Sequence, residues 1–365
     1  MKRDLYIDFA KGLATLSIIF IHTAFWSGQF YIPSEFRVLS LLIDVPIFFA
    51  LSGITSSGNI EKTLYRLLKL QITYMIFVTG LFFADWIFKV GVITFWDTDT
   101  LKSFYSTFGG KYIPQNPSAA IDWAQLGNWY LHSYTNCDTF PVVMGSFWYL
   151  KVYYIVTILG VLILRFFKQH ISWFIALCVA LTLIFNIDPN NYPSGQVGYV
   201  VYYLGVFLIG FQLKGKTIKK AYIPVLYVLA AISIITIGYI YGPDIYYKIN
   251  KQKFPPQVPY IVWSFLSLIT VFVLYNRLKI TKDTFINNIG RNAIFFYFAQ
   301  GISSSLVYFI VVPLKGNIHW AVLMVLIYVI NVILAILIAE VLKKADALGW
   351  KILEKLRKLT ARYNA

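Results

Sequence analysis

The chain of 365 residues is 58% hydrophobic and only 13% charged. This composition excludes an ordinary soluble globular protein, in which about 25% of residues are charged. Its formal net charge of +16 would suit a nucleic-acid-binding protein, but basic cytoplasmic loops give a membrane protein the same excess, and we favour that explanation over nucleic acid.

Apolar segments recur along the whole chain, each close to the roughly 20 residues that cross a bilayer as a helix. The first follows a basic start, but it contains Asp8 and Lys11 and has no small-residue cleavage site after it, so we interpret it as a retained helix and not a signal peptide. The sequence therefore predicts an all-α, polytopic membrane helical bundle with about ten transmembrane helices. In chain order, the predicted spans cover residues 7–26, 37–56, 70–91, 147–166, 171–187, 197–213, 222–241, 258–276, 293–312 and 318–341.

The distribution of basic residues sets the predicted orientation. With the N-terminus inside, 22 lysines and arginines fall on the cytoplasmic side and 7 on the outer side. Lys253 is one of the 7 and is predicted to lie in an outer loop. Positive residues concentrate in cytoplasmic loops, so we predict that both termini are cytoplasmic.

Three parts follow from this topology. Residues 1–342 form the predicted transmembrane domain, with one long outer loop at about 92–146. That loop is rich in aromatic residues, so it is either an ordered lid over an outward-facing site or a set of interfacial anchors. Residues 343–365 alternate leucines and basic residues at helical spacing, which predicts a basic amphipathic tail on the anionic cytoplasmic surface of the membrane lipid.

The first predicted helix carries three ionisable side chains. Lys11 and His22 are eleven residues apart, which is three turns plus about 20°, so both lie on one face, roughly 16 Å apart along the axis. Asp8 precedes Lys11 by one turn and can pair with it. Ionisable groups in a span are candidates for function, although a snorkelling Asp8–Lys11 pair and a helix-packing histidine are open alternatives.

The second predicted helix contains Asp44, followed by Pro46, which can kink the span. Asp44 can orient His22 if the two helices pair. Further along, Ser52 and Gly53 are small enough for a close helix approach.

Several other charged residues mark the ends and the interior of spans. Arg66, Lys69 and Arg291 lie on the predicted cytoplasmic side, where they are either phosphate ligands or headgroup anchors. Lys151 lies at the outer start of its span and is either an acceptor-binding or a charge-balancing group.

Inside the third span, Asp85 and Lys89 have i, i+4 spacing and should neutralise each other. The four histidines have no metal-ligand spacing, so no metal site is predicted.

An ordered set of motifs resembles the bacterial acyltransferase-3 family over nearly the whole chain. Its first element is a basic residue followed eleven positions later by His, with Asp just upstream, as in Asp8, Lys11 and His22. Three features depart from the family pattern: Lys11 stands where Arg is usual, Gln300 stands where His is frequent, and the Pro expected after the basic run near Arg66 is absent. The remaining matching segments are Phe48-Phe49-Ala50-Leu51-Ser52-Gly53, Phe147-Trp148-Tyr149-Leu150, Tyr203-Leu204-Gly205-Val206-Phe207-Leu208-Ile209-Gly210 and Ile289-Gly290-Arg291-Asn292.

The resemblance implies an acyltransferase of the bacterial cytoplasmic (inner) membrane that moves an acyl group, commonly acetyl from acetyl-CoA (an acyl-CoA donor), to a hydroxyl of a carbohydrate acceptor in the cell envelope. It implies His22 as general base, with Asp44 as its catalytic partner. Lys11, Arg66, Lys69 and Arg291 are assigned to the phosphates of acyl-CoA. Asp8, Ser52, Trp148 and Lys151 are assigned to substrate binding.

Two other functions stay open at this stage. The first is a transporter or flippase for a lipid-linked glycan or small solute, although the chain shows no internal repeat of the kind common in transporters. The second is a non-catalytic partner in polysaccharide export. The sequence also leaves a monomer and a homodimer open.

Overall fold

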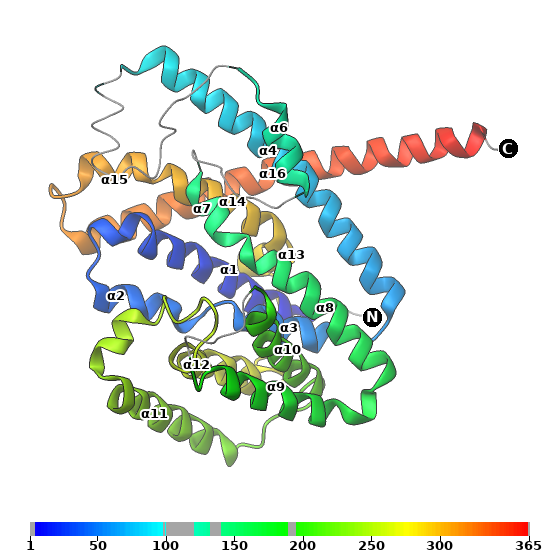
Figure 1. Ribbon diagram of the computed structural model, residues 1–365, viewed down its shortest axis with the longest axis vertical. Coiled ribbons are helices and arrows are strands. Elements are labelled where there is room, and N and C mark those ends of the chain that lie inside the picture. Colours follow the sequence, from blue (N-terminus) through cyan, green and yellow to red (C-terminus); the bar gives the residue numbers. More distant parts are fainter. Residues whose placement is uncertain (1–3, 98, 100–119, 132–139, 189–194, 364–365) are drawn as a thin grey trace. The chain divides into compact units, whose positions relative to one another are not determined.

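The computed structural model describes residues 4–97, 99, 120–131, 140–188 and 195–363. These residues form helices joined by turns, and the chain divides into two compact units, Met1–Tyr65 with Trp148–Ala293 and Arg66–Phe147 with Ile294–Ala365. Figure 1 shows the helices coloured along the chain, from blue at the N-terminus to red at the C-terminus. The all-α prediction is confirmed.

The first unit, called unit 1 below, contains most of the helices. They are α1 (Leu5–Phe25), η1 (Ser27–Phe30), α2 (Ser34–Leu39), η2 (Ser40–Leu42), α3 (Pro46–Thr55), α8 (Trp148–Phe166), η3 (Lys168–His170), α9 (Ile171–Phe185), α10 (Val197–Gln212), α11 (Tyr222–Tyr241), η5 (Pro243–Lys248), α12 (Val258–Leu274) and α13 (Phe285–Arg291).

The second unit, unit 2, contains the rest. Its helices are α4 (Ile60–Phe95, whose first turns belong to unit 1), α6 (Trp123–Leu131), α7 (Pro141–Ser146), α14 (Ala293–Leu306), α15 (Tyr308–Leu314) and α16 (Trp320–Tyr363).

The number of spans agrees with the hydropathy pattern. Among the described residues, 8 helical stretches are long and apolar enough to cross a membrane, and α10 and α12 are two shorter apolar helices. Together they correspond one to one with the ten predicted spans, so the prediction of a polytopic membrane bundle is confirmed. The cytoplasmic placement of both termini stays a prediction.

The boundaries differ from the prediction in several places, among them the start of α4 at Ile60 instead of residue 70. The second span is interrupted: η2 ends at Leu42 and α3 begins at Pro46, whose fixed φ suits the first position of a helix. Within the predicted outer loop, α4 continues to Phe95, and the helices α6 and α7 follow. Residues 98, 100–119 and 132–139 of this loop lie outside the described part, so the predicted lid stays a prediction. The predicted tail is helical to Tyr363, and α16 runs into it without a break at residue 342.

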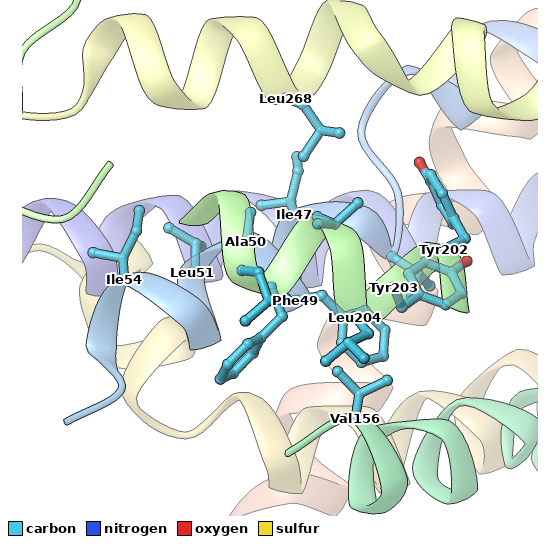
Figure 2. Packing of buried hydrophobic residues seen from close by; sticks show 14 of the residues in the cluster. Ile47, Phe49, Ala50, Leu51, Ile54, Val156, Tyr202, Tyr203, Leu204 and Leu268 are labelled. Atoms are coloured by element: carbon cyan, nitrogen blue, oxygen red, sulfur yellow. The ribbon is translucent and has the colours of Figure 1, made fainter. Parts of the chain in front are cut away.

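Unit 1 has an apolar core at the contact of α3 with α10 (Figures 1 and 2). Phe49 stacks on Tyr203 with ring centroids 4.4 Å apart, and Figure 2 shows Leu51, Leu204 and Val156 around them. Stacked rings add to the free energy of burial, so this contact fixes α3 firmly against α10.

Glycines permit two close helix crossings in unit 1. A Cβ on Gly12 of α1 would lie 2.0 Å from the carbonyl oxygen of Ile286, and a Cβ on Gly290 of α13 would lie 1.8 Å from that of Asp8. The crossing of α3 and α10 repeats the pattern at Gly53, which lies against Phe207 of α10. These motif glycines therefore bring backbones into direct contact, as small residues do in membrane helix pairs.

In unit 2, one predicted charge pair is confirmed. Lys89 Nζ lies 2.7 Å from Asp85 Oδ2 on α4, one turn apart. Because a charge buried alone is costly, this pairing lets both groups lie within the span.

Candidate active site

The polar stripe of the first helix lies on one unbroken element. The helix α1 begins after Asp4, whose side chain accepts a hydrogen bond from the backbone N–H of Tyr6. Since α1 continues to Phe25, Lys11 and His22 share a face about 16 Å apart along the axis, as predicted. Both side chains are half-buried, and Nδ1 of His22 is shielded from solvent. Asp8 is buried one turn before Lys11.

Asp44 occupies the interruption between η2 and α3, and its carboxylate is fully engaged. Oδ1 accepts from Lys253 Nζ at 2.8 Å and from the backbone N–H of Val45 at 2.7 Å, and Oδ2 accepts from the hydroxyl of Tyr260 at 2.9 Å. These donors hold the carboxylate in place. The orientation of His22 by Asp44 stays a prediction.

Lys253 was missed by the sequence analysis as a site residue. Its side chain is 6% exposed, although its segment was predicted to be an ordinary outer loop. Its ammonium group lies 5.5 Å from the ring centroid of Trp148, 5.6 Å from that of Phe254 and 6.0 Å from that of Tyr260. Cations are attracted to aromatic faces, so the rings and Asp44 together stabilise a buried charge. The one available signal was the apolar sequence Phe254-Pro255-Pro256 directly after it, which is unusual for a solvated loop.

Trp148 therefore belongs to the same cluster as Asp44. It is the first residue of α8, and its ring centroid lies 5.3 Å from that of Phe254 and 6.0 Å from that of Tyr203. Two predicted site residues, Asp44 and Trp148, thus meet through Lys253. We call Asp44, Lys253, Tyr260 and Trp148 the lysine cluster.

The two remaining substrate candidates have separate surroundings. Lys151, one turn after Trp148, is exposed. Ser52 on α3 is half-buried, and its backbone carbonyl accepts a hydrogen bond from the hydroxyl of Thr55 at 3.1 Å. Among the described residues, no contact assigns Lys151 or Ser52 a role in binding, so both roles stay predictions.

The predicted phosphate ligands fall in both units. Arg291, in unit 1, lies 2.6 Å from Asp283 through Nη1, so its charge is already paired. Arg66 and Lys69, in unit 2, are both exposed on α4, and Lys69 Nζ lies 5.5 Å from the ring centroid of Trp350. Exposed cations can bind a phosphate, and the assignment of Arg66, Lys69 and Arg291 to the donor phosphates stays a prediction.

Comparison with known families decides the assignment. A family model described as an acyltransferase domain matches residues 4–340. The chain belongs to the acyltransferase-3 family. The match includes all ten spans except the end of α16, so the acyltransferase-3 domain and the membrane bundle are the same part of the chain. No curated protein and no solved structure matches the chain.

Membership confirms the predicted resemblance and makes the protein a membrane acyltransferase. An acyltransferase needs an acyl donor and a nucleophilic acceptor, and the ionisable groups of α1 and the lysine cluster are candidate sites for handling them.

Proposed function

We propose that this acyltransferase-3 protein transfers an acyl group, in the first instance acetyl from acetyl-CoA, to a hydroxyl group of a carbohydrate or related acceptor of the cell envelope. The observation that carries the proposal is a titratable pair, Lys11 and His22, on one face of a single helix inside the family domain. Histidine is the side chain best suited to exchange protons near neutral pH.

In this proposal His22 is the general base. Its imidazole takes the proton of the acceptor hydroxyl while the hydroxyl oxygen attacks the thioester carbonyl. The new C–O bond forms, the C–S bond breaks, and the proton held by His22 passes to the departing thiolate. General base catalysis of this kind contributes roughly 10²–10⁴-fold to the rate.

The donor phosphates are assigned to cations on the predicted cytoplasmic side. Arg66 and Lys69 are exposed and lie one helical turn apart, which lets them bind one phosphate group together. Lys11, on the same helix as His22, is also proposed to bind a phosphate of the donor. Arg291 takes the same role by exchanging its partner Asp283 for a phosphate.

The acceptor is assigned to the lysine cluster and its neighbours. Trp148 offers a ring for stacking against a sugar, and its contact with Lys253 helps to hold that ring in place. The contacts of Asp44 support a role in holding Lys253, and its action on His22 is a separate proposal. Asp8, Ser52 and Lys151 are retained as substrate-binding candidates.

The test uses purified full-length protein in detergent or nanodiscs, with labelled acetyl-CoA and an envelope glycan fraction as acceptor. We expect His22→Ala to lower transfer by about 10²–10⁴-fold while thermal unfolding is unchanged. His170→Ala is the matched control, because His170 is exposed on η3. Wild-type transfer by folded His22→Ala would refute the mechanism. If the wild type transfers no acetyl group from acetyl-CoA but transfers an acyl group from another acyl-CoA, that other acyl-CoA is the donor.

A further inference from the structure

Helix α14 in unit 2 presents two different faces to its neighbours. One face carries Gly301 and Ser305 and packs on α7, where a Cβ on Gly301 would lie 2.8 Å from the Cα of Val143. The hydroxyl of Ser305 donates to the carbonyl of Gly301 at 2.8 Å and accepts from the backbone N–H of Val142 at 3.3 Å. Close packing and satisfied hydrogen bonds explain the small and polar residues of this face.

The other face carries Gln300, Ser303 and Ser304, which recur at i, i+3 and i+4 and are each at most 1% exposed. Ser304 Oγ accepts a hydrogen bond from Nδ2 of Asn331 on α16 at 2.9 Å, and Asn331 is also fully buried. We call Gln300, Ser303, Ser304 and Asn331 the amide patch. Its four members are polar but uncharged.

Gln300 is the member that helix packing does not explain. Its Nε2 donates to the carbonyl of Tyr297 at 3.2 Å. Its Oε1 is buried and accepts no hydrogen bond from any residue that the structure describes. An unsatisfied buried carbonyl is destabilising, and an apolar side chain of the same shape would remove that cost. A group that supplies a donor to Oε1 would satisfy it.

The amide patch lies well inside two candidate membrane spans. Gln300 lies seven residues after the start of α14, or about 10 Å along the axis, and Asn331 lies eleven residues after the start of α16, or about 16 Å. Both belong to candidate membrane spans, whose hydrocarbon layer is about 30 Å thick. The patch therefore lies inside the spans and away from their ends, where polar groups need partners.

We propose that the amide patch is a binding site for the pantetheine arm of the acyl donor. This inference rests on the proposed function, which supplies acyl-CoA as the donor. The arm is uncharged and carries amide and hydroxyl groups, so an N–H or O–H of the arm donates to Gln300 Oε1. Its carbonyl oxygens accept from the hydroxyl of Ser304, and from that of Ser303 when it gives up its 3.4 Å hydrogen bond to the backbone carbonyl of Gln300. The phosphates of the donor bind elsewhere, because the patch contains no cation.

Gln300→Met tests the proposal, since methionine keeps the length of the side chain but has no carbonyl. We expect the dissociation constants of both CoA and pantetheine, measured by calorimetry, to rise about 3- to 10-fold, the effect of one lost hydrogen bond. The midpoint of thermal unfolding should stay the same or rise. Ser305→Ala, on the α7-facing side of α14, is the matched control and should leave both dissociation constants unchanged.

Lys69→Ala separates the patch from the phosphate site. It should weaken CoA and leave pantetheine unchanged, because pantetheine has no phosphate. Should Gln300→Met fail to fold, Ser303→Ala is measured in its place, with the same expectation for both ligands.

Unchanged dissociation constants for both ligands in a folded Gln300→Met or Ser303→Ala protein would overturn this inference and leave the proposed function standing. A wild-type protein that binds neither CoA nor pantetheine would instead overturn the choice of donor, and this inference with it.

Discussion

Gly290→Ala tests whether the motif glycine of α13 is a packing residue. The added Cβ would lie 1.8 Å from the carbonyl oxygen of Asp8 and 2.8 Å from the backbone nitrogen of Gly12, both inside the 3.0 Å below which Cβ contacts essentially never occur. Both obstructing atoms are backbone atoms, so no side-chain rotation relieves the clash. The helices α1 and α13 must move apart.

The cost follows from this geometry. Overpacking of a tight core site destabilises by about 1–3 kcal/mol, and the helix propensity of alanine returns at most about 1 kcal/mol of it. For a unit of this size each kcal/mol lowers the unfolding midpoint by about 2–4 °C. We therefore expect Gly290→Ala to lower the midpoint by several degrees in a fluorimetric melt of the purified protein in detergent.

Gly80→Ala is the matched control, since no described atom lies within 4 Å of a Cβ built at Gly80 of α4. It should leave the midpoint unchanged or raise it. Gly12→Ala should act like Gly290→Ala, and the double variant should cost less than the sum, because both substitutions open the same crossing. A midpoint for Gly290→Ala equal to that of Gly80→Ala would refute the close α1–α13 contact.

Two further predictions concern buried polar contacts. Lys253→Met should destabilise the folded protein by about 3–5 kcal/mol, because it leaves the carboxylate of Asp44 buried without its cation. Adding Asp44→Asn should restore much of this loss. Equal melting midpoints for the single and double variants would contradict the ion pair. Thr73→Val removes the hydroxyl that donates a hydrogen bond to Asp346 Oδ1 at 2.8 Å. The end of α16 should then detach from α4 more often, and trypsin should cleave the basic tail faster. An unchanged cleavage rate would argue against this contact.

The sequence predicted features that depend on local spacing. The ten spans follow from the length of apolar segments, and the Asp85–Lys89 pair follows from its i, i+4 spacing. The start of α4 at Ile60, well before the predicted start at residue 70, was less predictable. The first turns of α4 are rich in charge, as at Glu61 and Lys62, and a polar stretch of helix that extends beyond the membrane has no hydropathy signal.

Long-range contacts could not be predicted in the same way. Asp44 and Lys253 are 209 residues apart in sequence, and a single sequence has no pattern that pairs them. Lys253 was counted among the charges of the outer loops because its sequence predicts a loop. The sequence does not show that its side chain is buried. The role of Gly290 was hidden for the same reason, since the clash that forbids a larger residue comes from the backbone of α1.

The glycines and the polar residues of the family motifs have different structural roles, even where they are neighbours in sequence. Gly290 has no space for a side chain, while Arg291 beside it is partly exposed and paired with Asp283. Likewise Gly12 lies against the backbone of α13, while Lys11 is only half-buried. A close backbone crossing leaves few alternative positions for the helix, so the residue next to the glycine has a well-defined place. Substitution of the glycines should therefore change stability and activity together, whereas Lys11→Gln and Arg291→Gln should change the affinity for the donor and leave the melting midpoint in place.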